Sequence, residues 1–478
     1  MKVFLCYPCG EMYQRGEDRC QSNIKASTST AMRACNDLGY MAAILRRYHS
    51  VFLRDYQTEK LTYDTMLEDI ISFKPNFLVL STTNATVFSD IVIINRLKKD
   101  TSINFKVVLK GAIFFNADFD LLRQLDLTNI DILVGGEIDW VIKDIVENTD
   151  LSNIKGIFYK DINGEWRKND FSCWNEDLDN IPFPARDLMK NELYIRPDTG
   201  EPMATIQTAR GCPSNCIYCL TPIISGKNVR FRTPQNVFQE LVECYDIYNI
   251  RNFFFKADTF TINKEWVFEL CDLIKNSHLY KNIEYTVNSR VKPISIEVLE
   301  ALKDTGCFTI AYGFESGSEE TLKLIKKGAT LEDAYNAVEM TKKVGIPIFG
   351  FFMIGFPWEN LDHIKETEKL IFDLNCDFIE VHIALPYYGS EFYNICKDND
   401  LLNGSEVGSD YFHTSMKGTN FIKNDKLVKI RKSILFKYCC RPSYIINKLI
   451  ACKFNPKIVR NYFYYGFRLI KNIFKRES

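Results

Sequence analysis

The sequence predicts an α/β protein with a doubly wound N-terminal sheet, an open barrel of six parallel strands and a helical C-terminal region. Short β-branched runs alternate with helical patterns in two separate series, which is typical of parallel sheets covered by helices. A connector rich in turn residues separates the two series. The length of 478 residues agrees with this division, because one ordinary core does not extend over so long a chain.

Composition excludes several classes of protein. Apolar residues make up 46% of the chain and charged residues 25%, which is typical of a globular protein. The net charge of −1 indicates no polyanionic partner such as nucleic acid. The N-terminus lacks the long apolar run of a signal peptide, and no window reaches the roughly 18 apolar residues of a membrane span. We therefore expect a cytoplasmic protein whose 16 cysteines are thiols or metal ligands.

Residues 1–147 are predicted to form the doubly wound, Rossmann-like domain. Its strands are expected at residues 2–6, 51–53, 76–81, 105–109 and 131–134, and helical spacing is clear in 30–48. Ligands of such sheets bind beyond the carboxyl ends of the strands. Those ends carry the short polar or glycine-rich segments 81–83, 110–111 and 135–137.

Residues 148–196 are predicted to be a connector. Runs at 154–159 and 165–168 flank Asp161-Ile-Asn-Gly164, which is typical of a β-hairpin, and Pro182 and Pro184 then favour an extended path. Residues 197–395 are predicted to form a partial (β/α)6, TIM-like barrel. Its strands are expected at 204–208, 252–256, 284–287, 308–313, 348–354 and 378–385. The chemistry of such barrels lies at the carboxyl ends of the strands.

Three cysteines follow the first barrel strand, in the segment Arg210-Gly-Cys212-Pro-Ser-Asn-Cys216-Ile-Tyr-Cys219. Spacers of three and two residues allow one loop to wrap a cube-shaped 4Fe-4S cluster. Such a cluster takes four thiolates when the protein holds it fully, so three leave one iron open for catalysis. A structural zinc site is the alternative, and Cys244 is the nearest candidate for its fourth ligand.

With this loop the chain resembles the radical S-adenosylmethionine (SAM) superfamily, and more narrowly its members with an N-terminal cobalamin-binding domain. The resemblance runs from residue 1 to about residue 395. It extends to segments near the ends of barrel strands, namely Arg230-Phe-Arg-Thr-Pro-Gln-Asn-Val237, Asp258-Thr-Phe260, Asn288-Ser-Arg290, Tyr312-Gly-Phe-Glu-Ser-Gly317, Phe352-Met-Ile-Gly-Phe-Pro357 and Pro386-Tyr-Tyr-Gly-Ser390. It implies an oxygen-sensitive, anaerobic enzyme in which Cys212, Cys216 and Cys219 hold the catalytic cluster. That cluster would cleave SAM and make a 5′-deoxyadenosyl radical.

The resemblance also implies which residues bind SAM and cover the cluster: Tyr218, Asp258, Arg290, Gly313, Glu315 and Gly355. Arg290 and Glu315 are charges beside apolar runs, which favours a ligand, although the two could instead pair with each other. Asp258 either contacts the substrate or caps a helix. His382, on the last strand, lies near the substrate or is a hydrogen-bonded core histidine.

The N-terminal domain is expected to bind cobalamin, with the nucleotide tail beside Ser81, Gly111, Gly136 and Glu137. This sequence departs from the family in two places. The loop after the first strand lacks the Asp-x-His-x-x-Gly motif that supplies a histidine to cobalt, and Lys110 stands where the family has glycine.

The resemblance implies that methylcobalamin donates a methyl group to the substrate radical, which gives C-methylation of an unactivated carbon. The alternative reaction is an oxidative cyclisation, as in the anaerobic cyclase that builds a chlorophyll ring, or another radical rearrangement of a porphyrin, lipid or natural product. A non-catalytic cobalamin or metal sensor is a more distant alternative. The expected partners are a small-molecule substrate and an electron donor such as flavodoxin or ferredoxin, without nucleic acid.

Residues 396–478 are predicted to be helical, aromatic and basic. From residue 417 onwards the sequence contains 16 Lys and Arg residues but only two acids, Asp425 and Glu477. Helices are expected at 445–452 and 458–474. They either cap the barrel, with their cations in water, or make peripheral contact with an anionic membrane.

Overall fold

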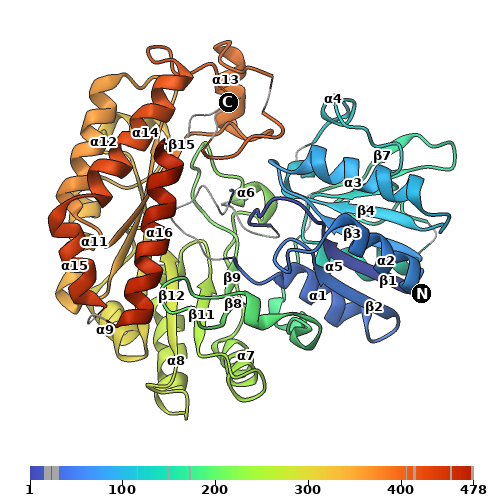
Figure 1. Cartoon of the computed structure of the whole chain (residues 1–478), viewed down its shortest axis with the longest axis horizontal. Coiled ribbons are helices and arrows are strands. Elements are labelled where there is room, and N and C mark those ends of the chain that lie inside the picture. The colour runs from blue at the N-terminus through green and yellow to red at the C-terminus, as the bar shows by residue number, and fades with distance from the viewer. Residues whose placement is uncertain are drawn as a thin grey trace.

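The structure is a computed structural model with two lobes, an N-terminal lobe and a larger barrel lobe (Figure 1). It describes residues 1–15, 23, 32–115, 117–148, 150–171, 174–404, 406–412, 416–452 and 455–474. Each lobe is built around one sheet, and the helices cover the sheet faces. The predicted α/β architecture is confirmed.

The N-terminal lobe contains the five predicted parallel strands, in the order β2-β1-β3-β4-β5. They are β1 (Lys2–Tyr7), β2 (Ser50–Asp55), β3 (Phe77–Ser81), β4 (Lys106–Lys110) and β5 (Ile132–Val134). The helices between them are α1 (Asn36–Leu45), α2 (Tyr63–Phe73), α3 (Val87–Asp100), the single turn α4 (Phe119–Leu122) and α5 (Ile138–Glu147). Helices cover both faces of this sheet, which explains why its central strands are apolar throughout.

The predicted hairpin forms, and it extends the first sheet. Strands β6 (Ile157–Lys160) and β7 (Trp166–Lys168) pair antiparallel, and β6 also pairs antiparallel with β5. Gly164 has a φ of 81°, which the turn between them requires. The first part of segment 148–196 therefore adds two strands to the N-terminal lobe.

The barrel lobe contains six parallel strands in chain order, as predicted. They are β8 (Met203–Gln207), β11 (Asn252–Lys256), β12 (Glu284–Ser289), β13 (Cys307–Glu315), β14 (Ile348–Ile354) and β15 (Phe378–Ile383). Helices α7 (Pro234–Asp246), α8 (Lys264–Lys275), α9 (Ile296–Asp304), α11 (Leu331–Val344) and α12 (Leu361–Leu374) connect them. β8 and β15 are the two edges of this sheet, so the barrel is open between them.

The C-terminal region consists of α13 (Glu391–Asp398), α14 (Asn424–Cys439), α15 (Pro442–Ala451) and α16 (Pro456–Phe474). α14 packs against the edge strand β15: Leu427, Ile434 and Leu435 join the barrel core, and Tyr438 donates a hydrogen bond to the Cys376 carbonyl at 2.5 Å. This part of the region caps the barrel. In the part of the chain that the structure describes, no helix is long and apolar enough to cross a membrane.

Buried contacts join the two lobes. Asn36, at the start of α1, donates to the Thr205 carbonyl of β8 at 2.7 Å. Arg210, three residues after the end of the first barrel strand, lies 2.9 Å from Asp139 of α5. The carboxyl ends of the two sheets therefore lie against each other, and the cysteine loop starts at this interface.

Candidate active site

The cysteine loop lies between two short paired strands, β9 (Ala209–Arg210) and β10 (Arg230–Phe231). Cys212 and Cys216 are buried and Cys219 is half-buried. Gly211 precedes them with a φ of 94°, and a Cβ there would lie 2.1 Å from the Asn228 carbonyl oxygen. Only glycine permits this close return of the loop, which keeps all three thiols at the carboxyl end of the barrel.

The zinc alternative is wrong. Cys244 lies in the core between α7 and the barrel sheet, beside Arg186, and burial raises the pKa of its thiol to about 12. Across the described residues, no three Cys, His, Asp or Glu side chains converge on one metal-ion position. A single zinc needs its sulfur ligands about 2.3 Å from one point. Three separate thiols suit a cluster instead, since each binds a different iron.

Arg290 lies beside the cysteine loop. It follows β12 directly, and its Nη1 is 3.6 Å from the Sγ of Cys216. Its Nη2 donates to the Lys327 carbonyl oxygen. Arg290 therefore places a positive charge directly beside a predicted cluster ligand.

Glu315 ends β13 and pairs with Lys327, not with Arg290. Its carboxylate oxygen lies 2.7 Å from Lys327 Nζ, and both side chains are buried. Glu315 has a φ of 68° at a register shift between β13 and β14, which turns it away from the regular strand. A Cβ on Gly313 would lie 2.5 Å from the Glu315 carboxylate, so this glycine leaves room for the pair. The alternative in which Glu315 pairs with Arg290 is wrong, whereas the predicted ligand role of the two residues stays a prediction.

Tyr218 connects the loop to this pair. Burial, the nearby Glu315 charge and a hydrogen bond with Glu315 raise the pKa of Tyr218 well above its usual value, so the phenol stays protonated. Its ring lies 6.0 Å from that of Phe356 in an apolar cluster beside the loop. The three cysteines, Tyr218, Arg290 and Glu315 therefore share one end of the barrel.

Asp258 follows β11, where it accepts a hydrogen bond from Thr221 Oγ1 at 3.3 Å. It is not a helix cap, because Asn263 caps the following helix α8 and Thr259 precedes the short turn at 260–262. Its assignment to substrate or SAM remains a prediction. His382 stacks between the rings of Phe351 and Tyr411 at 5.9 and 4.8 Å, and burial lowers its pKa, so it is a neutral core histidine.

The loop after β14 is held by a carboxylate that the sequence did not single out. Glu359 is fully buried, and its Oε2 accepts hydrogen bonds from the backbone N–H groups of Gly355 and Phe356 at 2.6 and 3.1 Å. Gly355 turns here with a φ of 98°. The position, two residues after Pro357, was visible in the sequence, but only the fold shows that the carboxylate points back into the loop.

This carboxylate gives a pH prediction. Burial raises the pKa of Glu359 to about 7 despite the two backbone donors. The folded state therefore holds a proton that the unfolded state releases near pH 4.5, so the Glu359 contribution is most favourable below pH 4.5 and is lost as the pH rises through 7. Relative to Glu359→Gln, we expect wild type to lose about 3 kcal/mol of unfolding free energy between these values. Anaerobic urea unfolding of both proteins tests this, and parallel pH profiles would contradict it.

At the carboxyl edge of the first sheet, Asp37 is the centre of a buried network. Ser81 Oγ donates to it at 2.8 Å, Lys110 Nζ lies 3.2 Å away, and Tyr7 donates its hydroxyl to the other oxygen. Burial opposes ionisation of Asp37, but Lys110 and the hydrogen bonds outweigh it and hold its pKa below the usual value. The pair occupies the edge where the resemblance places the nucleotide tail of cobalamin.

The other residues expected at the tail have different surroundings. A Cβ on Gly111 would lie 2.7 Å from Thr82 Cγ2, so this loop is closely packed. Gly136 is open, since a Cβ there would meet only Phe115 at 3.9 Å. Glu137 is buried and pairs with Arg230 at 2.6 Å and Arg210 at 3.3 Å. Its role as seen here is to join the lobes. The buried Lys110–Asp37 pair lies at the same edge.

Glu137→Ala is expected to loosen the contact between the lobes. The change leaves Arg230 buried without its carboxylate, which costs about 3 kcal/mol of unfolding free energy. Trypsin should then cut faster in the segment that joins the lobes. Glu147→Ala, at the far end of the helix α5 that follows Glu137, is 35% exposed at its side chain; it is the control and should change stability by about 0.5 kcal/mol or less. Equal effects from both changes would contradict the account.

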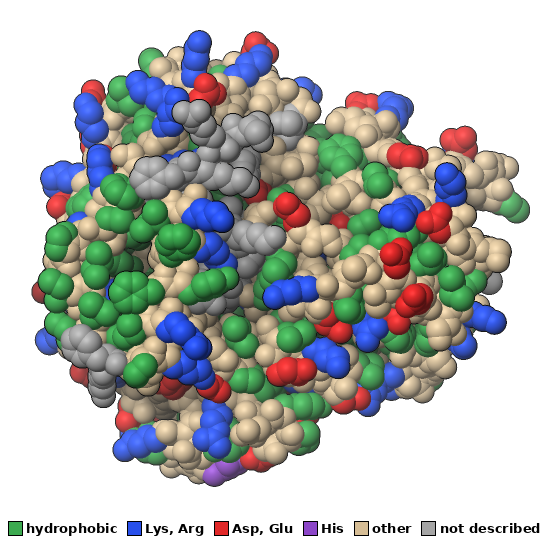
Figure 2. All heavy atoms as spheres, in the orientation of Figure 1, with side chains coloured by type: hydrophobic (Ala, Val, Ile, Leu, Met, Phe, Trp, Pro, Cys, Tyr) green, Lys and Arg blue, Asp and Glu red, His purple; other side chains and the backbone are tan. Residues whose placement is uncertain are grey.

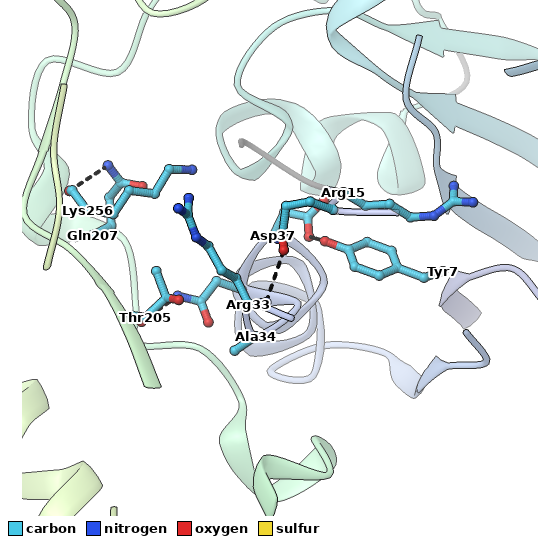
Figure 3. A pocket seen from close by; sticks show the side chains of 10 residues that line it. Tyr7, Arg15, Arg33, Ala34, Asp37, Thr205, Gln207 and Lys256 are labelled. Atoms are coloured by element: carbon cyan, nitrogen blue, oxygen red, sulfur yellow. Dashed lines mark hydrogen bonds between the residues drawn. The ribbon is translucent and has the colours of Figure 1, made fainter. Parts of the chain in front are cut away.

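A small polar pocket of about 20 Å³ lies between the lobes (Figure 3). Its walls come from the first lobe and from the inner face of β8 and β11: Tyr7, Gln14, Arg15, Arg33, Ala34, Asn36, Asp37, Thr205, Gln207 and Lys256. Arg33 crosses to the barrel, where its guanidinium lies 4.2 Å above the ring of Phe254. Arg33 and Lys256 point toward the same space from opposite walls. The pocket joins the carboxyl ends of both sheets.

Comparison with known proteins agrees with this geometry. Residues 206–371 match the family described as the radical SAM superfamily, and these residues contain the cysteine loop, Arg290 and Glu315. An uncharacterised methyltransferase of Pyrococcus horikoshii is 32% identical over 370 residues, which cover 76% of this chain and 79% of that protein. The anaerobic magnesium-protoporphyrin IX monomethyl ester cyclase of Rubrivivax gelatinosus is 25% identical, over 74% of this chain and 65% of the cyclase.

The fold also matches a solved structure over nearly its whole length. The cobalamin-dependent SAM radical enzyme OxsB, with aqua-cobalamin and SAM bound, superposes with a TM-score of 0.72. The match covers 99% of this chain and 72% of OxsB at 15% identity, so it concerns the fold alone. The arrangement of the two lobes and the C-terminal helices in this chain is therefore also found in a solved structure. The chain belongs to the radical SAM superfamily and is an enzyme of that type, with a 4Fe-4S cluster and SAM as its cofactors.

Proposed function

We propose that this enzyme transfers a methyl group to an unactivated carbon of a small molecule, with cobalamin as the methyl carrier. The observation that supports this most is the doubly wound lobe, whose strand ends lie against the cysteine loop of the barrel. The relative of 32% identity carries the name of a methyltransferase, and the fold match over 99% of the chain is to a cobalamin-dependent enzyme.

The residues at the barrel end have distinct tasks in this proposal. Cys212, Cys216 and Cys219 hold the cluster, which supplies one electron to the SAM sulfonium when both are bound. Arg290 and the Glu315–Lys327 pair offer charged and hydrogen-bonding groups to the polar parts of SAM. The apolar cluster around Phe356 excludes water from the radical.

Cobalamin, when bound, supplies a transferable methyl group. We expect the Lys110–Asp37 pair to oppose entry of its nucleotide tail, since the pair is buried at the edge where the tail is expected. Replacing a buried pair by apolar groups is often neutral or stabilising by about 1–4 kcal/mol, so such a change removes the pair without leaving a buried charge. The double variant Asp37→Leu/Lys110→Gly is therefore expected to bind hydroxocobalamin at least about tenfold more tightly than wild type. Fluorescence quenching measures the two dissociation constants. Unchanged or weaker binding of hydroxocobalamin by the double variant would show that the Lys110–Asp37 pair does not oppose entry of the tail.

Cyclisation is the second candidate reaction, since the anaerobic cyclase is similar over 74% of this chain. In either case the enzyme acts in the cytoplasm and takes its electron from a donor such as flavodoxin or ferredoxin. A non-catalytic sensor is less favoured, because a sensor needs no half-buried Arg290 beside a cluster thiol.

The products of SAM distinguish these reactions. The protein is reconstituted anaerobically with iron, sulfide and hydroxocobalamin, desalted, and reduced in the presence of SAM. Methyl transfer leaves S-adenosylhomocysteine, and we expect it only in samples that retain cobalt. Formation of 5′-deoxyadenosine without S-adenosylhomocysteine would favour cyclisation or rearrangement. Loss of all cobalt on desalting would remove cobalamin from the proposal but leave the radical chemistry.

A further inference from the structure

The last two helices expose an unusual amount of apolar surface. On α16, the side chains of Phe463, Tyr464 and Phe467 are 65%, 63% and 71% exposed, and Ile470 is 39% exposed. Phe463, Phe467 and Ile470 follow one another at intervals of four and three residues, so they share one face of the helix. These exposed fractions leave much of this apolar face open to solvent.

α15 adds to the same region. Ile445, Ile446 and Ile450 are 45%, 54% and 59% exposed. Together with the four residues of α16 they form what we call the C-terminal patch: Ile445, Ile446, Ile450, Phe463, Tyr464, Phe467 and Ile470. In Figure 2, apolar side chains interspersed with Lys and Arg gather on the side where α14, α15 and α16 lie in Figure 1. Scattered apolar residues are normal on a surface, but a contiguous set is a sign of a binding face.

The charge of this region has one sign. Between Pro442 and Phe474 the sequence has six Lys and Arg residues and no Asp or Glu. Arg460 lies one turn before Phe463, and Lys471 lies one turn after Phe467; both are exposed. Aromatic side chains flanked by cations on one helix are the arrangement that lies in the interface of an anionic bilayer.

A second copy of the chain fits the patch less well. Two copies of the same face would bring Arg460 and Lys471 of each copy together, and neither helix carries an acid. A bilayer with anionic headgroups offers the apolar depth for Phe463 and Phe467 and the charge for Arg460 and Lys471 at the same time.

We propose that the C-terminal patch docks the enzyme onto an anionic lipid surface, with the face of α16 that carries Phe463 and Phe467 in the headgroup region. This inference does not depend on which reaction the barrel performs.

Vesicle flotation of the cluster-loaded full chain tests the proposal. We expect wild type to float with vesicles of phosphatidylcholine containing roughly a third phosphatidylglycerol, and to stay behind with pure phosphatidylcholine or at high salt. Phe463→Ser/Phe467→Ser should reduce the bound fraction at least about tenfold. The matched control is Phe88→Ser/Val92→Ser on α3, where the side chains are 44% and 65% exposed outside the patch. This control should float like wild type.

Three results would overturn the proposal. One is failure of wild type to bind anionic vesicles. Another is binding that survives the Phe463→Ser/Phe467→Ser change. The third is a dimer in light scattering that those two substitutions dissociate, without vesicle binding, since that would assign the patch to a second copy of the chain. Far-UV circular dichroism of each variant confirms that α16 is still folded, so a lost signal is not mistaken for unfolding.

Discussion

Cys216→Ala is expected to abolish both the cluster and the cleavage of SAM. Cys216 is buried in the middle of the cysteine loop, 3.6 Å from Arg290, and a cluster held by only two thiolates leaves a second iron without a protein ligand. We expect iron content and the broad visible absorption of the cluster to fall to background. Formation of 5′-deoxyadenosine should fall by at least about a thousandfold, because the electron has no route to the sulfonium.

Cys440→Ala is the matched control for this change. Cys440 is half-buried at the end of α14 and lies outside the loop. Its replacement should leave both the iron content and the rate unchanged. Retained cluster in the Cys216→Ala protein, or equal losses in the two variants, would contradict the assignment of ligands.

Lys327→Met is expected to have the largest effect on stability at the site. It leaves the Glu315 carboxylate buried without its cation, and breaking such a pair costs about 3–5 kcal/mol of unfolding free energy. SAM affinity should fall as well, because Glu315 and Tyr218 lose their fixed positions. Urea unfolding measures the first effect, and equilibrium binding of SAM to the cluster-loaded protein measures the second.

The neighbouring residue provides the control. Lys326 also pairs with a carboxylate, Glu391, but its side chain is 52% exposed, so Lys326→Met should cost about 0.5 kcal/mol or less. Adding Glu315→Gln to Lys327→Met removes the unpaired charge and should restore much of the lost stability. If Lys326→Met and Lys327→Met were equally costly, burial would not govern the pair.

The strands of both sheets were predictable because each is a short apolar run between helical patterns. The predicted six barrel strands and five N-terminal strands all form, and β11 and β14 have the predicted bounds. The destination of the hairpin 157–168 was not predictable, since the sequence of a hairpin does not say which sheet edge it joins. The same holds for α14, whose packing on β15 depends on contacts between distant segments.

At the active site, the sequence identified the functional side chains but not the residues that pair with them. The three cysteines stood out because their spacing is local. Lys327 did not stand out in the sequence. It lies beside Glu315 because the chain turns back after α10 (Glu319–Leu324). Glu137 was expected at a cofactor, and the structure gives it two arginines from the other lobe. Pairing across a domain interface leaves no periodic signal in the sequence.

The cysteine loop and the strand ends around it are expected to cleave SAM by one-electron reduction. The most direct test of this cleavage is the amount of 5′-deoxyadenosine formed when the cluster-loaded protein is reduced anaerobically with SAM and the products are measured by mass spectrometry. We predict its formation by wild type and its absence without reductant or with Cys216→Ala. No 5′-deoxyadenosine from wild type whose cluster is fully assembled and reduced would contradict the account.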